Sequence, residues 1–126
     1  MDFPKDLKYS ENHSWVKVDG DTGTVGITDY AQEQLSEVVF IELPEVGNVV
    51  DKEDAVAELE SSKSVSAVHT PVSGEIIDIN ESLSDSPEII NKSPYKDGWI
   101  FKIKLSSMPE INKLMTHEQY LKFIEE

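Results

Sequence analysis

The sequence predicts a mostly β fold with short helices that lie mainly at the C-terminal end. Short runs of β-branched and aromatic residues alternate with polar ones and are separated by Gly, Pro and Asp, which is typical of strands joined by turns. From about residue 107 onward, the apolar residues recur at helical spacing instead. The 126 residues suit a single domain, 1–126, with a core of ordinary size.

The N-terminal part predicts a β-hairpin followed by a short helix. His13–Val18 (HSWVKV) and Thr22–Ile27 (TGTVGI) are the two strands, and Asp19–Asp21 is the turn between them. Asp29 and Gln32 have the spacing of a capping box, which predicts the start of a helix. The residues that recur at helical spacing in this segment are Tyr30, Ala31, Gln34 and Leu35.

Three further strands and a helical turn are expected along the middle of the chain. Val38–Leu43 (VVFIEL) is rich in β-branched and aromatic residues, which indicates a buried strand. Glu75–Asn80 (EIIDIN) is also strand-like, and Gly98–Leu105 (GWIFKIKL) alternates large apolar residues with lysines. Ser86–Glu88 predicts a helical turn with proline at its first position.

The C-terminal segment, about residues 107–126, is expected to be helical. Ser107 with Glu110, and Thr116 with Gln119, have capping-box spacing ahead of apolar residues. These two signals predict two consecutive helix starts within the segment.

A weak internal repeat surrounds one lysine. Pro44–Gly47 and Pro71–Gly74 are both Pro-x-x-Gly and both precede apolar runs, so they are consistent either with two ordinary turns or with pseudo-symmetric halves of a two-layer sheet. In the second interpretation, Glu58–His69 (ELESSKSVSAVH) forms a hairpin with Lys63 at its tip. The tip contains no Asn-Gly or Asp-Gly pair of the kind that favours a tight turn, so the hairpin prediction rests on the flanking alternation.

Composition excludes several classes of protein. There are 25 acidic residues against 11 basic ones, all lysine, and the net charge of −14 disfavours nucleic acid as a partner. The chain has no cysteine, and therefore no disulfide, thiolate metal site or cysteine nucleophile. No segment is long and apolar enough to span a membrane, and the start (MDFPKDLKYS) does not resemble a targeting peptide. We therefore expect a cytoplasmic protein. We also expect a monomer, although none of these features bears on self-association.

Enzyme motifs are scarce in the sequence. The three histidines, His13, His69 and His117, have no metal-ligand spacing, and there is no Gly-x-Ser-x-Gly elbow or Gly-rich phosphate loop. Lys63 is the residue singled out, although a lone lysine between serines is most often a solvated turn residue. At a hairpin tip, its amine would be open to acylation, and the acylated side chain would form a swinging arm whose chemistry belongs to the attached cofactor.

Several strings, in order over nearly the whole chain, resemble the H protein of the glycine cleavage system. No single string is specific for this family, but the occurrence of all of them in the same order is. They are Asn12–Val18, Val25–Gln32, Val38–Pro44, Glu60–Lys63, Pro71–Glu75 and Asp97–Trp99.

The resemblance implies a barrel-sandwich hybrid (lipoyl-domain-like) fold, with lipoic acid attached to Lys63 through an amide. It implies a carrier protein rather than an enzyme, with no catalytic or metal-binding residues of its own. The lipoyl arm would carry the aminomethyl group of glycine from the P protein to the T protein, and the L protein would reoxidise the arm. A lipoate ligase or an octanoyl transferase would install the arm.

Three alternatives remain open at this stage. The chain could serve mainly as a lipoyl donor for other lipoate-dependent complexes. It could be a biotinyl domain, although Ser62 and Ser64 stand where that family has methionines. It could also be an acidic interaction module without a cofactor.

The sequence departs from the family pattern at several positions. Ser62 stands in place of the usual valine, and Ser36–Glu37 in place of Gly-Asp. Ser14 and Ala67 stand where many members have acids. We expect the loss of these two acids to weaken the docking of the loaded arm in a surface groove, because a buried ammonium needs a compensating charge or several acceptors.

Overall fold

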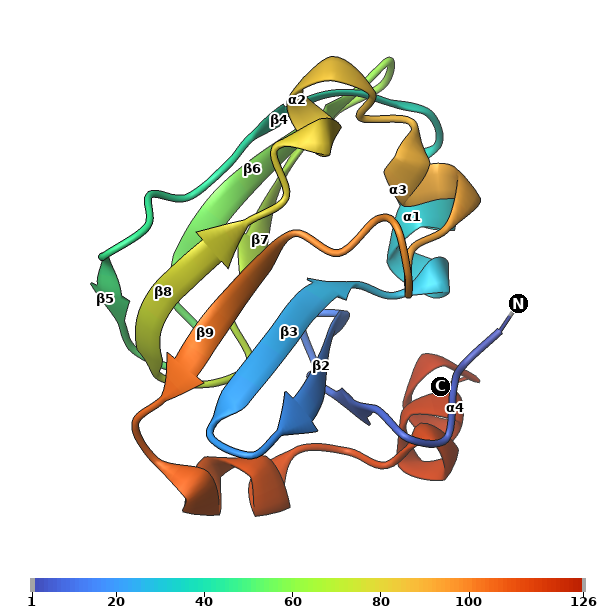
Figure 1. Ribbon diagram of the computed structural model, residues 1–126. Coiled ribbons are helices and arrows are strands. Elements are labelled where there is room, and N and C mark those ends of the chain that lie inside the picture. Colours follow the sequence, from blue (N-terminus) through green and yellow to red (C-terminus); the bar gives the residue numbers. More distant parts are fainter. Residues whose placement is uncertain (1, 126) are drawn as a thin grey trace.

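Two antiparallel sheets form most of the structure, a computed structural model that describes residues 2–125 (Figure 1). The larger sheet has the strand order β1-β2-β3-β9-β8-β5, and the smaller one has the order β4-β6-β7. The strands are β1 (Lys8–Tyr9), β2 (Ser14–Asp19), β3 (Thr22–Ile27), β4 (Val38–Glu42), β5 (Val49–Val50), β6 (Ala55–Ser61), β7 (Val65–His69), β8 (Gly74–Ile79) and β9 (Phe101–Leu105). The helices are α1 (Asp29–Leu35), α2 (Ser82–Asp85), α3 (Ile89–Lys92), the 3₁₀ helix η1 (Met108–Lys113) and α4 (His117–Glu125).

The predicted N-terminal hairpin is confirmed as β2 and β3, and a glycine allows its close packing. Trp15 is paired with Gly26 across the two strands. A Cβ atom at Gly26 would lie 2.7 Å from the Trp15 ring, so only glycine leaves room for the indole there. The indole Nε1 donates to the carbonyl oxygens of Ile27 and Pro94, each at 3.0 Å. The buried tryptophan therefore ties the hairpin to the loop that follows α3.

Helix α1 is present as predicted, but its cap lies one residue earlier than the capping-box spacing indicated. Thr28 has an extended backbone, and its Oγ1 accepts a hydrogen bond from the Ala31 amide at 3.2 Å. Asp29 is already within the helix and cannot cap it; its carboxylate instead accepts from the Gln32 side-chain amide at 2.6 Å. Asp29 and Gln32 are thus in contact, but through their two side chains and not through the backbone bonds of a capping box.

Strand β4 lies where it was predicted, but the prediction that it is buried is only half right. Val38 and Ile41 are buried, whereas Val39 and Phe40 are each about half exposed, at 52% and 51%. The pairing of β4 with β6 is irregular between Val38 and Phe40. This bulge breaks the alternation and turns two consecutive side chains outward.

The two Pro-x-x-Gly segments lead into strands that pair with each other. Val50 of β5 is the register partner of Gly74, the first residue of β8. The Gly47 amide donates to the Ile76 carbonyl at 2.7 Å. Each of the two Pro-x-x-Gly turns therefore precedes one strand of an antiparallel pair in the larger sheet.

The region between β8 and β9 is more helical than predicted. The turn at Ser86–Glu88 is confirmed by a hydrogen bond from the Ile89 amide to the Ser86 carbonyl, and it leads into α3. Helix α2 was not predicted. Strand β9 is shorter than Gly98–Leu105, because it begins at Phe101. Within it, Phe101, Ile103 and Leu105 are buried, as their alternation indicated.

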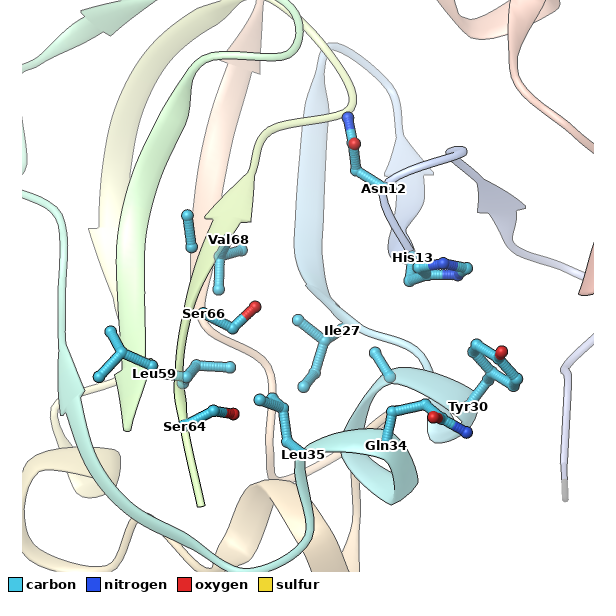
Figure 2. A pocket seen from close by; sticks show the side chains of 13 residues that line it. Asn12, His13, Ile27, Tyr30, Gln34, Leu35, Leu59, Ser64, Ser66 and Val68 are labelled. Atoms are coloured by element: carbon cyan, nitrogen blue, oxygen red, sulfur yellow. The ribbon is translucent and has the colours of Figure 1, made fainter. Parts of the chain in front are cut away.

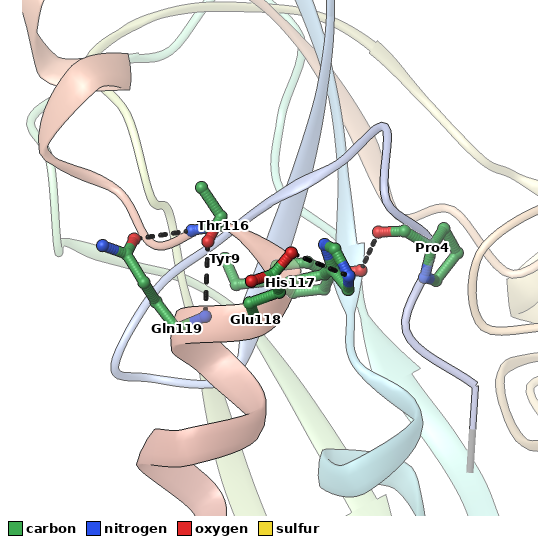
Figure 3. A network of polar contacts seen from close by, with 6 residues as sticks. All are labelled: Pro4, Tyr9, Thr116, His117, Glu118 and Gln119. Atoms are coloured by element: carbon green, nitrogen blue, oxygen red, sulfur yellow. Dashed lines mark hydrogen bonds and ion pairs between the residues drawn. The ribbon is translucent and has the colours of Figure 1, made fainter.

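The C-terminal segment confirms one of its two predicted helix starts. The Thr116 amide donates to Oε1 of Gln119 at 2.9 Å, and the Gln119 amide donates to Oγ1 of Thr116 at 3.3 Å, which is a complete capping box at the start of α4 (Figure 3). Ser107 makes no side-chain capping bond, and the helix that follows it is 3₁₀. The Glu110 carboxylate instead accepts hydrogen bonds from the amide and hydroxyl of Ser73, at 2.8 and 2.7 Å.

Two hydrophobic clusters hold the elements together. The larger lies between the sheets and includes Val25, Leu59, Ile76, Phe101 and Ile103. The smaller joins the N-terminal segment to α4, which lie next to each other in Figure 1, and is centred on Tyr9, Trp15 and Tyr120. Among residues 2–125, no helix has the length and apolar character needed to cross a membrane.

Candidate functional site

Strands β6 and β7 form a hairpin, and Lys63 lies in its tip as predicted. Glu60 is paired with Val65, and the Ser61 amide donates to the Ser64 carbonyl at 2.8 Å, so Ser62 and Lys63 are the two central residues of the turn. Lys63 is exposed. Among the described residues, no carboxylate lies within 4.0 Å of its amine. The amine is therefore available for covalent modification.

The hydroxyl of Ser61 supports this turn. Its Oγ accepts hydrogen bonds from the amides of Lys63 (3.2 Å) and Ser64 (3.1 Å) and donates to the Ser64 carbonyl (3.2 Å). Neither central residue of the turn has a positive φ. The serine side chain thus provides hydrogen bonds in a turn that lacks the residues favoured by the usual tight hairpin turns.

The outward face of the small sheet carries acids and apolar side chains in register. One row across the three strands is Phe40, Glu60 and Val65, and the next is Glu42, Glu58 and Ala67. Phe40 and Val65 are more than half exposed. Like charges that face each other across a pair of strands disfavour the sheet slightly, so the pairing of β4 with β6 does not itself require Glu42 opposite Glu58.

A groove of about 430 Å³ opens beside the hairpin (Figure 2). Strand β7 forms one wall and helix α1 the other, and the loop before β2 closes one end. Its thirteen lining residues are Asn12, His13, Ile27, Tyr30, Ala31, Gln34, Leu35, Leu59, Ser64, Val65, Ser66, Ala67 and Val68. None of them is an acid or a lysine, so the groove combines apolar surface with amides and hydroxyls.

Helix α1 contributes the four groove residues that were predicted to recur at helical spacing. Tyr30, Ala31, Gln34 and Leu35 all line the groove. Their spacing indicated a shared face, but the sequence carried no signal that this face borders a groove and not the core. The role of α1 in the site was therefore missed at the sequence level.

His13, at one end of the groove, is held by a buried chain of hydrogen bonds. Its Nδ1 lies 2.8 Å from the hydroxyl of Tyr120, which lies 2.8 Å from Oγ1 of Thr28. Thr28 is fully buried, and its hydroxyl has no other acceptor among the described residues. Thr28 therefore donates to Tyr120, Tyr120 donates to His13, and Nδ1 is an acceptor.

This arrangement requires a neutral imidazole. Burial lowers the pKa of His13, and it raises the pKa of Tyr120 to about 12, so that the phenol stays protonated. His13 also has a positive φ of 65°, which is uncommon for a residue other than glycine. Its backbone turn directs the ring toward the groove and α4 instead of into β2.

The structure separates the two positions at which acids are missing. Ala67 lines the groove as predicted, but Ser14 does not. Ser14 is fully buried, and its hydroxyl donates to the His69 carbonyl at 2.6 Å. The expectation that a missing acid at position 14 weakens arm docking is wrong, because this side chain lies in the interior and the residue that lines the groove is its neighbour His13.

An exposed lysine at the tip of a hairpin, in a pair of antiparallel sheets beside an uncharged groove, is an arrangement suited to a carrier protein. The family model for "Glycine cleavage H-protein" matches residues 7–126, and the chain belongs to this family. Among curated relatives, the glycine cleavage system H protein of Halothermothrix orenii is 48% identical over 126 residues, covering 100% of this chain and 98% of that protein. That of Thermus thermophilus is 48% identical over 125 residues, covering 99% and 98% of the two chains.

A solved structure gives the same result. The crystal structure of a glycine cleavage system H protein from Mycobacterium marinum has a TM-score of 0.90 and 33% sequence identity, and covers 98% of this chain and 100% of that one. The predicted mostly β, lipoyl-domain-like fold is thereby confirmed. A family member of this kind is a carrier component of the glycine cleavage system and not an enzyme.

Proposed function

We propose that this chain carries lipoic acid on Lys63 and shuttles the aminomethyl group of glycine from the P protein to the T protein, with the L protein reoxidising the arm. The observation that supports this most directly is the placement of Lys63, exposed in the hairpin tip and without an ion pair among the described residues. The chain acts as one carrier domain over its 126 residues, as a monomer in the cytoplasm.

The residues present fit a lipoyl group. An amide on the Lys63 amine would remove its charge, and no carboxylate within salt-bridge distance would lose a partner among the described residues. The groove begins at Ser64, the next residue, and follows β7. When attached, the lipoyl group supplies a disulfide–dithiol couple that can bear a one-carbon amine.

The groove is suited to shielding the end of the arm from water. Leu35 and the exposed Val65 provide apolar surface for the alkyl chain, whereas Ile27, Leu59 and Val68, also in the lining, are almost fully buried. The amide oxygens of Asn12 and Gln34 are candidates to accept hydrogen bonds from an ammonium group, since no carboxylate lines the groove. Neutral acceptors compensate a buried ammonium less than a carboxylate does, so docking at this site is expected to be readily reversible.

The acidic outward face suits transient encounters. Glu42 and Glu58 lie on the same face as the exposed Phe40 and Val65, next to the tip. A basic rim around the active-site entrance of a partner enzyme would be attracted to this face at long range and would release it easily. The same face is available to the lipoate ligase or octanoyl transferase that installs the arm.

The test is the intact mass of the protein from its native host and of a Lys63→Arg variant. Arginine keeps the positive charge but has no acylatable amine, so the variant should fold normally, carry no lipoyl adduct and support no glycine cleavage. Lys17→Arg, at an exposed position of strand β2, should behave like the wild type. A biotinyl mass, an unmodified wild type, or a lipoyl adduct on Lys63→Arg would each refute the proposal.

A further inference from the structure

The two-residue turn that presents Lys63 lacks the asparagine and glycine residues that usually occupy such turns. Two-residue hairpin loops favour turns with positive φ at one or both central residues, which is why Asn-Gly and Gly-containing pairs dominate them. The central residues here are Ser62 and Lys63, and neither has a positive φ. A turn of this kind does not match the twist of the flanking strands, so the tip needs another source of order.

Ser61 supplies that order through its side chain. A serine hydroxyl has one hydrogen to donate and two lone pairs to accept with, and all three are used within the tip. Oγ accepts from the Lys63 and Ser64 amides and donates to the Ser64 carbonyl. The Ser64 amide, which would pair with the Ser61 carbonyl in an ordinary two-residue hairpin, is thus bound by the Ser61 side chain.

No neighbouring serine has this role. Ser62 and Ser64 are exposed, and their hydroxyls form no hydrogen bond within the described part of the chain. The three serines around the lysine therefore look alike in sequence but differ in structure. Only the hydroxyl of Ser61 bonds to the backbone of Lys63 itself.

We propose that Ser61 is a positioning residue for the modification of Lys63. Its hydroxyl keeps the backbone of the tip in one conformation, and this is the conformation that the acylating enzyme binds when it modifies the lysine. This inference rests on the proposed lipoylation of Lys63. In the reaction, the unprotonated amine attacks the carbonyl carbon of an acyl adenylate made from lipoate and ATP. The new N–C bond forms, the C–O bond to phosphate breaks, AMP leaves with the electron pair, and the amine's extra proton is lost to solvent.

Without the hydroxyl, the enzyme would have to select the competent conformation from several. That cost falls on binding and not on the chemical step, so it should raise KM and leave kcat nearly unchanged. The loss of exposed hydrogen bonds of this kind corresponds to a roughly three- to tenfold fall in kcat/KM. The sheet below the tip does not depend on this contact, so the melting temperature should hardly change.

The experiment measures kcat and KM for the unlipoylated protein as substrate of a lipoate ligase with lipoate and ATP. Ser61→Ala should show the raised KM. Ser61→Thr keeps the hydroxyl on a residue that strands favour and should restore the wild-type value. Ser62→Ala is the matched control, since it removes a neighbouring hydroxyl that forms no bond in the tip, and it should leave both constants unchanged.

A second measurement follows the tip directly and needs no enzyme. Hydrogen exchange of the Lys63 and Ser64 amides, observed by NMR, should accelerate in Ser61→Ala but not in Ser62→Ala. Acylation of the amine by a small activated ester should be equal in all variants, because that reagent needs no defined tip. If amide exchange is unchanged in Ser61→Ala, or if exchange accelerates while KM stays the same, the inference is overturned.

The outcomes also separate this inference from the proposed function. If the ligase acylates neither the wild type nor any variant, or if it still acylates Lys63→Arg, the assignment of Lys63 fails. If the wild type is acylated at Lys63 and Ser61→Ala and Ser62→Ala lose activity equally, the assignment holds. In that case the enzyme recognises serines in general, and the positioning role of Ser61 is refuted.

Discussion

The hairpin tip and the C-terminal helix of this protein are held in opposite ways. At the tip, one hydroxyl bonds to residues two and three positions away, and all of these contacts are exposed. At α4, Tyr120 bonds to His13 and Thr28, 107 and 92 positions away, and is fully buried. The comparison indicates that the turn at Lys63 is held by local contacts, whereas the end of the groove is built by long-range contacts.

This difference separates function from stability. A change in the tip removes few contacts and should alter modification but not folding. A change around Tyr120 opens a cluster in which its ring is stacked on Tyr9 at 4.9 Å and packs edge-on against Phe3. The main effect of such a change should be a lower free energy of unfolding. A smaller effect should reach the groove through the contact between Tyr120 and His13.

The largest effect is expected from Tyr120→Ala. Removing a fully buried aromatic ring should cost about 3–5 kcal/mol, a large share of the stability of a domain of this size. The free energy of unfolding from urea titration measures it. Lys63→Arg is the contrasting variant and should lie within about 0.5 kcal/mol of wild type, as surface substitutions usually do. Similar losses for both variants would contradict the proposed separation.

Tyr120→Phe sharpens this comparison by removing only the hydroxyl. The ring still fills the cluster, but Thr28 loses its acceptor and His13 loses its donor. A buried hydroxyl without a partner costs about 1–3 kcal/mol, so the loss should fall between those of the other two variants. Phe123→Tyr, a change near the same cluster that leaves this chain of bonds in place, serves as the control. Wild-type stability in Tyr120→Phe would show that the chain of bonds contributes nothing net.

The pH dependence of stability should report on His13. Its pKa in the folded protein is lowered from 6.5 by burial, so the unfolded state binds the proton more readily. The stabilising contribution is complete above about pH 6.5 and is lost as the pH falls from there toward the lowered folded value. Tyr120 and Tyr30 are the titratable groups that face the ring, and burial raises the pKa of Tyr120 to about 12, so that its phenol has no charge to offset the added proton in this range.

The measurement is the urea midpoint of wild type and His13→Gln between about pH 5 and pH 8. The wild type should lose more stability on acidification than the variant does. His117→Gln, at the start of α4, is the control and should keep the wild-type slope. Parallel curves for wild type and His13→Gln would contradict a neutral His13 in the folded state.

The smallest effect is expected in the groove itself, from Ala67→Asp. The new carboxylate would lie where β7 borders the groove, with Glu58 of β6 as its cross-strand neighbour, and would compensate an ammonium on the loaded arm better than the neutral lining residues do. A partly exposed pair of this kind is worth about 0.2–1 kcal/mol, which is roughly up to a fivefold change in docked population. The lifetime of the isolated loaded form at neutral pH should lengthen accordingly.

Two variants bracket this last prediction. Ala67→Asn introduces a side chain of nearly the same shape as aspartate but without its charge. It should leave the lifetime of the loaded form closer to that of the wild type. Ser14→Glu should not help, because it would place a carboxylate in a fully buried site and remove the hydrogen bond to His69. An equal gain from Asp and Asn at position 67 would show that charge is not what limits docking.

Much of this architecture could be predicted from residues close together in the chain. The Thr116–Gln119 capping box, the strand alternation of Phe101, Ile103 and Leu105, and the placement of Lys63 between two strands all follow from spacings of a few residues. Such features depend on backbone geometry alone, which is the same in any fold. The net charge and the lack of cysteine also needed no structure.

Other features were decided by packing between distant segments. Glu110 was predicted as a capping residue but binds Ser73, and Ser14 was predicted to reach the groove but lies in the interior. The exposure of Phe40 depends on a bulge against β6 that its own strand does not reveal. In each case the outcome depends on a segment distant in the sequence: Ser73 for Glu110, His69 for Ser14 and β6 for Phe40.

The sequence by itself determined the kind of protein, most of the longer strands and the lysine at the tip, but not the two-residue strands β1 and β5. Only the tertiary structure decided what surrounds that lysine. The groove draws its walls from the loop before β2, from α1 and from β7, and the buried bonds at its end join His13 to Tyr120. The periodicity of a segment indicates which of its faces is apolar. It does not indicate against which other element that face will pack, or whether it will line a groove.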